Sequence, residues 1–200
     1  MKVAIFSGGP FENVQIEDFA VLICADKGYL YARNLGLKPN FVLGDFDSLG
    51  FVPDGAETYS VDKDLSDLEL AIDKAVSLKA SEIDMYFCVG GQIDHELFNV
   101  SLLNKCKQNG IRGRILTQNQ VIELIDYTDN HKVFTCKEKG RVSLVPYTDE
   151  VIFIGSDGLK YDLKGVVSTR GKTLTLSNRA TGSTFIVEIK DGSALLTTER

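Results

Sequence analysis

The pattern of hydrophobic and polar residues changes near residue 120 of this 200-residue chain. Before that point, short apolar runs alternate with segments in which apolar residues recur every three or four positions. This alternation is typical of strands and helices that build a mostly parallel sheet. The runs at 21–24 and 85–89 are apolar throughout, as expected for strands buried on both faces. The predicted strands of this part are residues 2–6, 21–25, 41–43, 57–61, 83–89 and 114–117.

Helical periodicity is clearest in residues 29–35, 66–79 and 94–108. The second segment opens with Ser66 and has Glu69 three positions later, which is the pattern of a capping box. The third segment stops near Asn109-Gly110, a common helix end. The face that we expect this third helix to bury carries Leu97, Phe98, Val100, Ser101, Leu102 and Asn104.

After residue 120 the helical patterns stop, and short strand-like runs are separated by turn residues such as Lys139-Gly140 and Asp191-Gly192. This texture predicts an antiparallel β-sandwich. We therefore expect two domains: an α/β domain with an open, mostly parallel sheet over residues 1–120, and an all-β domain over 121–200. The predicted strands of the second domain are residues 121–127, 131–135, 141–146, 151–154, 161–163, 173–176, 185–190 and 194–197.

Composition narrows the possible partners. The 22 Lys and Arg residues against 28 Asp and Glu give a net charge of −6, and no basic stripe is present, so we expect no nucleic-acid partner. No apolar run approaches the ~20 residues that span a bilayer, so we expect no membrane insertion. The four cysteines form no C-x-x-C pair and are expected to stay reduced, which suits a cytoplasmic protein.

Polar clusters follow five predicted strands of the first domain. In an open parallel sheet, ligands bind at the carboxyl ends of the strands, so we expect these clusters to meet at one edge. Asp and Gly also favour turns, and a lone Asp after a strand is often only a turn former or a helix cap. Five such clusters at one edge are not explained by turn chemistry alone. The clusters are residues 7–9 (SGG), 26–28 (DKG), 44–48 (GDFDS), 62–67 (DKDLSD) and 90–95 (GGQIDH).

Asp45 and Asp47 are the most informative pair. In an extended backbone, a spacing of two points both carboxylates the same way and turns Phe46 to the opposite side. Two like charges so placed repel each other unless a cation lies between them. Mg²⁺ is held by one or two carboxylates together with phosphate oxygens, so the pair predicts a magnesium–phosphate site.

Glycines supply the second part of the predicted phosphate site. Gly8, Gly9, Gly90 and Gly91 allow backbone N–H groups to approach phosphate oxygens closely. The chain has neither G-x-G-x-x-G nor G-x-x-x-x-G-K-[ST], which excludes the dinucleotide fingerprint and the P-loop. The phosphate site is therefore expected to be of another kind.

At these residues the chain resembles the thiamine pyrophosphokinase family, in particular its bacterial branch. The resemblance runs in order through nearly the whole length, although Gln92 stands where the family usually has arginine. The matching segments are residues 25–28 (ADKG, for A-D-x-G), 36–48 (GLKPNFVLGDFDS), 64–69 (DLSDLE, for D-x-T-D-x-E), 90–95 (GGQIDH, for G-G-R-x-D-H), 158–163 (GLKYDL, for G-L-K-Y-P-L) and 177–178 (SN).

The resemblance implies transfer of the diphosphate group of ATP to the hydroxyl of thiamine, with Mg²⁺ as cofactor and AMP as the second product. It implies an N-terminal ATP- and Mg²⁺-binding domain, a C-terminal β-sandwich, and a homodimer that binds thiamine between its subunits. The residues expected to bind the metal are Asp26, Asp45, Asp47 and Asp67, and those expected to be catalytic are Asp45, Asp47, Asp67 and Asp94. The residues expected to contact ATP are Gly8, Gly9, Lys27, Ser48, Lys63, Asp64, Ser66, Gly90, Gly91, Gln92 and His95. The residues expected to contact thiamine are Asp94, Ser177 and Asn178.

Several alternatives stay open at this point. Either Asp67 or Asp94 could accept the proton of the thiamine hydroxyl, and either Lys27 or Lys63 could replace the charge that Gln92 lacks. The same design could serve another alcohol such as a hydroxymethylpterin, or could belong to a non-catalytic nucleotide sensor. A flavodoxin-like redox protein would share only the open sheet, and a fold alone does not set function.

Overall fold

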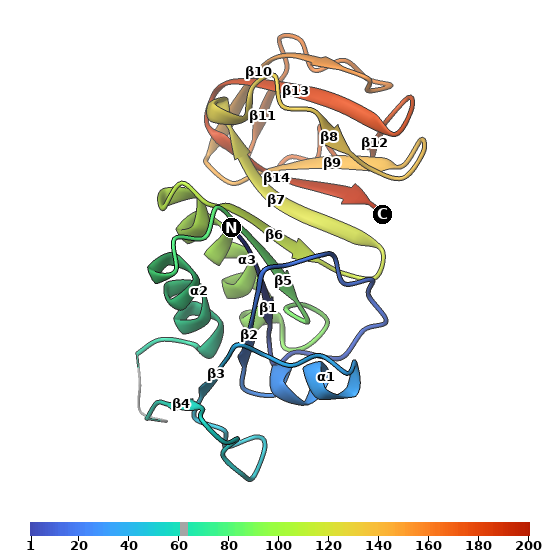
Figure 1. Cartoon of the computed structure of the whole chain (residues 1–200). Helices are drawn as coiled ribbons and strands as arrows, with labels where there is room; N and C mark the ends of the chain where they lie inside the picture. Colours follow the sequence, from blue (N-terminus) through green and yellow to red (C-terminus); the bar gives the residue numbers. More distant parts are fainter. Residues whose placement is uncertain (61–63) are drawn as a thin grey trace. The chain divides into compact units, whose positions relative to one another are not determined.

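The computed structural model describes residues 1–60 and 64–200. The chain divides into two compact units, which we call the first unit (Met1–Gln118) and the second unit (Asn119–Arg200). Figure 1 colours the chain from blue at the N-terminus to red at the C-terminus, so the first unit runs from blue to green and the second from yellow to red.

The first unit is built on a parallel sheet in the strand order β6-β5-β1-β2-β3-β4. The strands β1, β2 and β5 are each buried over most of their length, as expected for the centre of a parallel sheet. The predicted α/β fold with a mostly parallel sheet is therefore confirmed. The strands are β1 (Lys2–Phe6), β2 (Val21–Ala25), β3 (Phe41–Gly44), β4 (Glu57–Thr58), β5 (Glu82–Tyr86) and β6 (Arg112–Leu116).

Within residues 1–60 and 64–118, three helices accompany this sheet: α1 (Gly28–Asn34), α2 (Asp67–Ser77) and α3 (Ile93–Gln108). α1 packs on β1 and β2, α2 packs on β1, β2 and β3, and α3 packs on β6 (Figure 1). Ser66 caps α2 by accepting the backbone N–H of Glu69 at 3.2 Å. The carboxylate of Glu69 binds Lys105 at 2.8 Å, so the structure records one half of the predicted capping box. None of the helices in the described residues has the length and apolar character needed to cross a membrane.

The face that α3 buries differs from the prediction. Leu103 and Cys106 are buried, whereas Leu97 and Phe98 are 67% and 73% exposed. The prediction was wrong because the sheet covers the later part of α3, where it packs against β6. The periodicity of apolar residues could not show which of two apolar stripes meets the sheet.

A buried network of charges ties the segment between β1 and β2 to the sheet. Asp84, which is 1% exposed, accepts two hydrogen bonds of 2.7 Å from Arg114 and lies 2.8 Å from the Lys2 ammonium. Glu17, in the connecting segment, accepts hydrogen bonds from Arg114 at 2.7 Å and from Lys2 at 2.9 Å. Asp84 and Arg114 are almost out of water, whereas Lys2 and Glu17 are partly exposed, and the four charges compensate one another.

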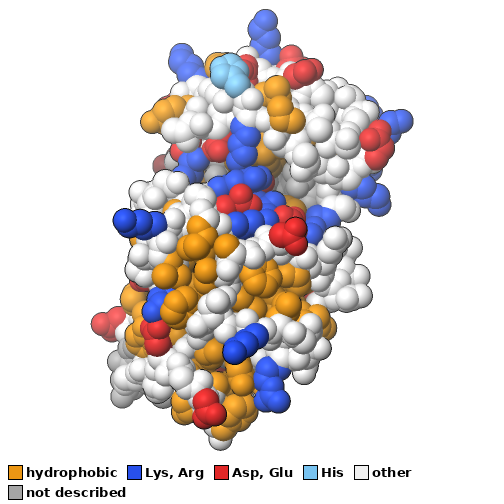
Figure 2. Space-filling model, in the orientation of Figure 1, with side chains coloured by type: hydrophobic (Ala, Val, Ile, Leu, Met, Phe, Trp, Pro, Cys, Tyr) orange, Lys and Arg blue, Asp and Glu red, His pale blue; other side chains and the backbone are white. Residues whose placement is uncertain are grey.

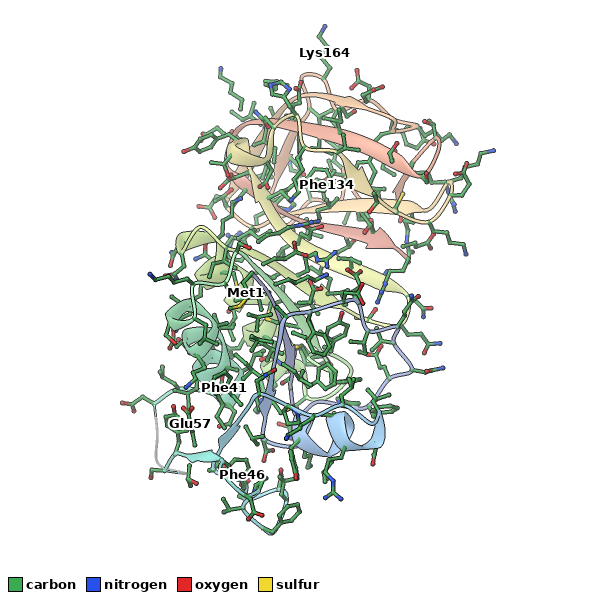
Figure 3. All side chains as sticks on the ribbon, in the orientation of Figure 1. Met1, Phe41, Phe46, Glu57, Phe134 and Lys164 are labelled. Atoms are coloured by element: carbon green, nitrogen blue, oxygen red, sulfur yellow. The ribbon has the colours of Figure 1, made fainter. Side chains whose placement is uncertain are left out.

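The second unit contains two antiparallel sheets, which confirms the predicted all-β fold. One has the order β12-β9-β14-β7 and the other the order β11-β10-β13-β8. Buried side chains from both sheets form one core; among them is Phe134, labelled in Figure 3, which is 2% exposed. The strands are β7 (Gln120–Asp126), β8 (Phe134–Thr135), β9 (Arg141–Pro146), β10 (Glu150–Asp157), β11 (Val167–Thr169), β12 (Asn178–Arg179), β13 (Thr184–Asp191) and β14 (Ser193–Glu199), with the short 3-10 helix η1 (Tyr127–Asp129) after β7.

Two predicted strands of this unit, 161–163 and 173–176, are wrong. Residues 174–177 form a turn in which Thr175 is buried and donates its hydroxyl to the Leu144 carbonyl oxygen, while Leu174 and Leu176 are exposed. The backbone of Tyr161 is bound by the side chain of Asn178 instead of a neighbouring strand. In residues 173–176 apolar alternation misleads because the polar Thr175, and not Leu174 or Leu176, points inward.

Candidate functional site

A cavity of about 830 Å³ opens in the first unit at the carboxyl ends of the parallel strands. Its walls come from the segments that follow β1, β2, β3 and β5 and from the N-terminal turns of α2 and α3. Twelve predicted site residues line it: Gly8, Gly9, Asp26, Lys27, Asp45, Asp47, Ser48, Ser66, Asp67, Gly91, Gln92 and His95.

The remaining predicted residues lie elsewhere. Asp64, Gly90 and Asp94 belong to the same unit but are not among the residues that line the cavity. Ser177 and Asn178 belong to the second unit. Lys63 lies outside the described residues.

Three carboxylates converge in the cavity. Asp26, Asp45 and Asp47 each offer one oxygen, and these oxygens lie within 4.8 Å of one another. The backbone that brings them together is not extended as the sequence pattern suggested, because Phe46 has a φ of +60° and Asp26 a φ of +48°. Phe46, labelled in Figure 3, is 3% exposed and anchors the turn in the core. Left-handed backbone at residues other than glycine is costly and is concentrated at functional sites.

Asp26 provides the clearest sign that a cation fits here. Its Oδ2 accepts the hydroxyl of Ser48, whereas its Oδ1 is buried and has no hydrogen-bond partner among the described residues. A buried carboxylate oxygen without a partner is expensive, and a divalent cation would compensate it. The donor set is therefore three carboxylates, which is the oxygen-rich chemistry that Mg²⁺ prefers.

Steric contacts explain why a glycine, Gly44, precedes this turn. Gly44 has a φ of +149°, and a Cβ at this position would lie 3.3 Å from the backbone nitrogen of Asp26. A side chain would therefore strain the backbone and push β3 away from the turn that carries Asp26. Asp67, in the first turn of α2, is also close, since its Oδ1 would be 3.5 Å from the same Cβ.

The glycine loops already use part of their hydrogen-bonding capacity. Gly9 donates its N–H to the Phe87 carbonyl oxygen at 3.0 Å, and Gly90 donates its N–H to Glu96 Oε1 at 2.8 Å. A Cβ on Gly9 would lie 2.4 Å from the Phe87 oxygen, so close packing on the end of β5 requires glycine at this position. Two of the N–H groups predicted for phosphate are thus committed to the protein in this conformation.

α3 contributes a polar stripe to the cavity wall, of which Gln92 and His95 were predicted from the sequence and Glu96 and Asn99 were not. Gln92, at the N-cap, and His95, Glu96 and Asn99 all line the cavity. Their spacing of three and four residues places them on one face of the helix, and this spacing was the signal available in the sequence. Asp94 lies between them, and its Oδ1 accepts the backbone N–H of His95 at 2.9 Å.

Tyr31 is a second missed residue. It comes from α1, lines the cavity and donates its hydroxyl to the Gly9 carbonyl oxygen at 2.7 Å. Burial, and next the negative charge of Asp26, raise the pKa of the Tyr31 hydroxyl. Its ring contacts those of Phe11 and Phe87. Figure 2 shows hydrophobic side chains gathered over the middle of the first unit on the face in view.

In the second unit, the two predicted thiamine residues differ in accessibility. Ser177 is exposed and has a φ of +61°. Asn178 is 5% exposed, and its amide oxygen accepts the N–H groups of Tyr161 (3.1 Å) and Arg179 (2.8 Å). Its amide nitrogen donates to the Tyr161 carbonyl oxygen at 2.7 Å. The side chain of Asn178 therefore has a structural task that the motif did not reveal.

Comparison with known families decides the identity of this arrangement. Residues 14–115 match the model of the thiamin pyrophosphokinase catalytic domain, and residues 130–196 match the model of the thiamin pyrophosphokinase vitamin B1 binding domain. The chain belongs to the thiamin pyrophosphokinase family. The resemblance inferred from the sequence motifs is confirmed.

Individual relatives agree with this assignment. A thiamine pyrophosphokinase of Bacillus subtilis is 26% identical over 189 residues, which cover 88% of each chain. A crystal structure of thiamine pyrophosphokinase from the same species has a TM-score of 0.87 at 24% identity, covering 100% of this chain and 99% of that one. The thiamin pyrophosphokinase of Geobacillus thermodenitrificans has a TM-score of 0.84 at 25% identity, covering 100% and 98%. The fold extends to the enzyme of Candida albicans, with a TM-score of 0.79 at 18% identity over 99% and 88%.

Membership in this family makes the chain an enzyme, an ATP-using diphosphotransferase. The carboxylate cavity lies in the first unit, which contains the match to the catalytic domain, and the second unit contains the match to the vitamin B1 binding domain.

Proposed function

We propose that the cavity of the first unit binds ATP together with Mg²⁺ and that its residues direct the β-phosphoryl group to the hydroxyl of thiamine. The observation that carries this proposal is the convergence of Asp26, Asp45 and Asp47 within 4.8 Å, in a unit that matches the family's catalytic domain. Thiamine diphosphate and AMP are the products.

Asp26, Asp45 and Asp47 are the residues that would hold Mg²⁺, and Asp67 borders the same space. The ion supplies charge neutralisation for the phosphates and for the negative charge that grows in the transition state. The buried Oδ1 of Asp26, with no hydrogen-bond partner among the described residues, supports this assignment.

The other cavity residues position the triphosphate and the alcohol. Lys27 is the one lysine or arginine among the described residues that line the cavity, and we assign it to the phosphates together with His95 and Gln92. Gly8, Gly9, Ser48, Ser66 and Gly91 complete the phosphate-facing wall. Asp64 and Gly90 stay proposed ATP contacts although they do not line the cavity. Lys63, which lies outside the described residues, stays a proposed ATP contact as well.

The transfer exchanges one P–O bond for another. The thiamine hydroxyl oxygen forms a bond to the β-phosphorus while the bond from that phosphorus to the bridging oxygen of the α-phosphate breaks, and AMP leaves with the bonding electrons. The hydroxyl proton needs an acceptor, and Asp67 is favoured over Asp94 because Asp67 lines the cavity. Positioning and charge neutralisation account for most of the catalysis in such a transfer.

We assign thiamine to Asp94, Ser177 and Asn178, and we propose a homodimer that completes this binding site. Support for a dimer comes from Ile93, Leu97 and Phe98 on α3, which are 74%, 67% and 73% exposed beside Asp94. Exposed apolar clusters of this kind mark contact surfaces. Sedimentation of the wild-type chain and of Phe98→Glu tests this point: a dimer for the first and a monomer for the second are expected. We also propose a cytoplasmic location, in line with four free cysteines.

The test of the proposed function is an incubation of the protein with ATP, MgCl₂ and thiamine, followed by chromatography of the products. We expect AMP and thiamine diphosphate in equal amounts, and no turnover after chelation of the metal. ADP and thiamine monophosphate would contradict the proposal. AMP release with a hydroxymethylpterin and not with thiamine would identify a different acceptor.

A further inference from the structure

Glu96 lines the cavity, but its carboxylate is directed to the protein backbone. Its Oε1 accepts the N–H of Gly90 at 2.8 Å, in the turn that joins β5 to α3. This contact is a charge-assisted hydrogen bond, which is stronger than one between neutral groups. The proposed function gives Glu96 no role, so its hydrogen bond to the turn needs a separate explanation.

A second side chain of α3 holds the same turn. Asn99 donates its Nδ2 to the Cys88 carbonyl oxygen at 2.8 Å. Residues three apart lie on one face of a helix, so Glu96 and Asn99 reach the turn side by side. One accepts from the backbone and the other donates to it, and together they bind both ends of the segment Cys88–Gly90.

The turn fixed in this way forms a wall of the cavity. Gly90 has a φ of +95°, a conformation that L side chains rarely adopt. The next two residues, Gly91 and Gln92, both line the cavity. Gly91 also lies against the loop that follows β1, since a Cβ on it would be 3.3 Å from Pro10 Cδ. A shift of Gly90 would therefore displace Gln92 and reach the loop of Gly8 and Gly9.

We infer that Glu96 is a positioning residue for ATP: its carboxylate fixes the Gly90 N–H and thereby places Gly91 and Gln92 against the phosphates. This inference rests on the proposed function for its consequence in catalysis. Glu96 itself touches no substrate in this scheme. The opposite role, an anion that competes with the phosphates for the Gly90 N–H, would change ATP affinity in the other direction.

Two substitutions separate these roles. Glu96→Gln keeps an oxygen acceptor for the Gly90 N–H, and we expect its KM for ATP to stay within about twofold of wild type. Glu96→Ala removes the acceptor, and we expect its KM for ATP to rise about tenfold, the size of effect that loss of a hydrogen bond to a charged group produces. In both variants KM for thiamine and kcat should change by less than about threefold. Asp73→Ala is the matched control, because it removes a carboxylate that binds Lys105 outside the cavity wall.

Hydrogen exchange gives a readout that does not depend on activity. The Gly90 amide should be protected in the wild type and in Glu96→Gln and should exchange faster by about tenfold or more in Glu96→Ala, with unchanged melting temperature. Equal effects of both substitutions, no effect of either, or a lower KM for ATP in Glu96→Ala would overturn the positioning role. If the wild type makes no thiamine diphosphate, the proposed function fails, while exchange at Gly90 and the Kd of Mg–ATP still decide the role of Glu96.

Discussion

The two units use the polar residues of their motifs in different ways. In the first unit, the carboxylates that follow β2 and β3 converge in a cavity, and Asp26 keeps a buried oxygen with no hydrogen-bond partner among the described residues. In the second unit, the amide of Asn178 makes three hydrogen bonds with the backbone of Tyr161 and Arg179. The difference shows that a motif residue can mark either a ligand contact or a structural support, and only its partners distinguish the two.

The largest expected effect is at the carboxylate cluster. We expect Asp47→Asn to lower kcat/KM for AMP formation by about a thousandfold or more, because the neutral amide weakens metal binding and charge stabilisation. Asp47 is exposed, so the variant should still melt cooperatively near the wild-type temperature. Product chromatography and circular dichroism provide the two measurements.

The matched control for this variant is Asp54→Asn, an exposed aspartate of the same unit that does not line the cavity. Its kcat/KM should stay within about twofold of wild type. Near-wild-type turnover of Asp47→Asn at low Mg²⁺ would show that Asp47 does not bind the metal. It would also weaken the contrast between ligand-binding motif residues in the first unit and structural ones in the second.

The second expected effect is on stability. Asn178→Ala removes three hydrogen bonds from a nearly buried side chain, and we expect the free energy of unfolding to fall by about 2–4 kcal/mol. Ser177→Ala, at an exposed neighbour, should change it by less than about 0.5 kcal/mol. Urea denaturation of both variants measures the difference. Equal, small effects would show that the amide of Asn178 is not a structural support.

A smaller effect is expected at Lys27. Lys27→Gln removes an exposed positive charge from the cavity wall, and we expect KM for ATP to rise about fivefold, or about 1 kcal/mol. Lys38→Gln, at an exposed lysine that does not line the cavity, is the matched control. An unchanged KM for ATP in Lys27→Gln would show that other groups bind the phosphates. Steady-state kinetics at saturating thiamine measure the KM for ATP of both variants.

The smallest expected effect is on the pH dependence of stability, through the carboxylate of Glu17 in the first unit. Burial alone would raise the pKa of Glu17, but hydrogen bonds from Lys2 and Arg114 outweigh it and hold the pKa at about 2. Because the pKa of Glu17 is lower in the folded state, its ionised carboxylate stabilises the fold at pH values above the unfolded pKa of about 4.5. This contribution to the free energy of unfolding is lost as the pH falls toward 2. Since Glu17 is one-third exposed, the contribution is below about 1 kcal/mol.

Glu17→Gln tests this expectation. The difference in unfolding free energy between wild type and variant should be constant above pH 5 and should shrink between pH 4.5 and pH 2. A difference that does not depend on pH in this window would show that packing, not charge, ties the segment between β1 and β2 to the sheet. Denaturation curves at several pH values provide the measurement.

Much of the fold could be predicted from the sequence. The ranges of β1, β2 and β9 match the predicted ones because their apolar runs are bounded by turn residues and are long enough to be unambiguous. The predictions at 161–163 and 173–176 failed because side chains of Asn178 and Thr175 take over hydrogen bonds that a strand would make. Such side chain–backbone bonds leave no periodic signal.

The linear order of residues specifies the residue types at the strand ends and, through ordered motifs, the family. Which of those residues share a cavity follows from the folded chain. Asp26 and Asp47 are 21 positions apart in the sequence, yet the left-handed turns at Asp26 and Phe46 bring their carboxylates together. Asp94 is one position from His95 but does not line the cavity with it, because successive helix positions are rotated by about 100° and Asp94 falls outside the stripe formed by Gln92, His95, Glu96 and Asn99. Backbone conformation and helix phase are set by packing in three dimensions, and a linear motif does not contain them.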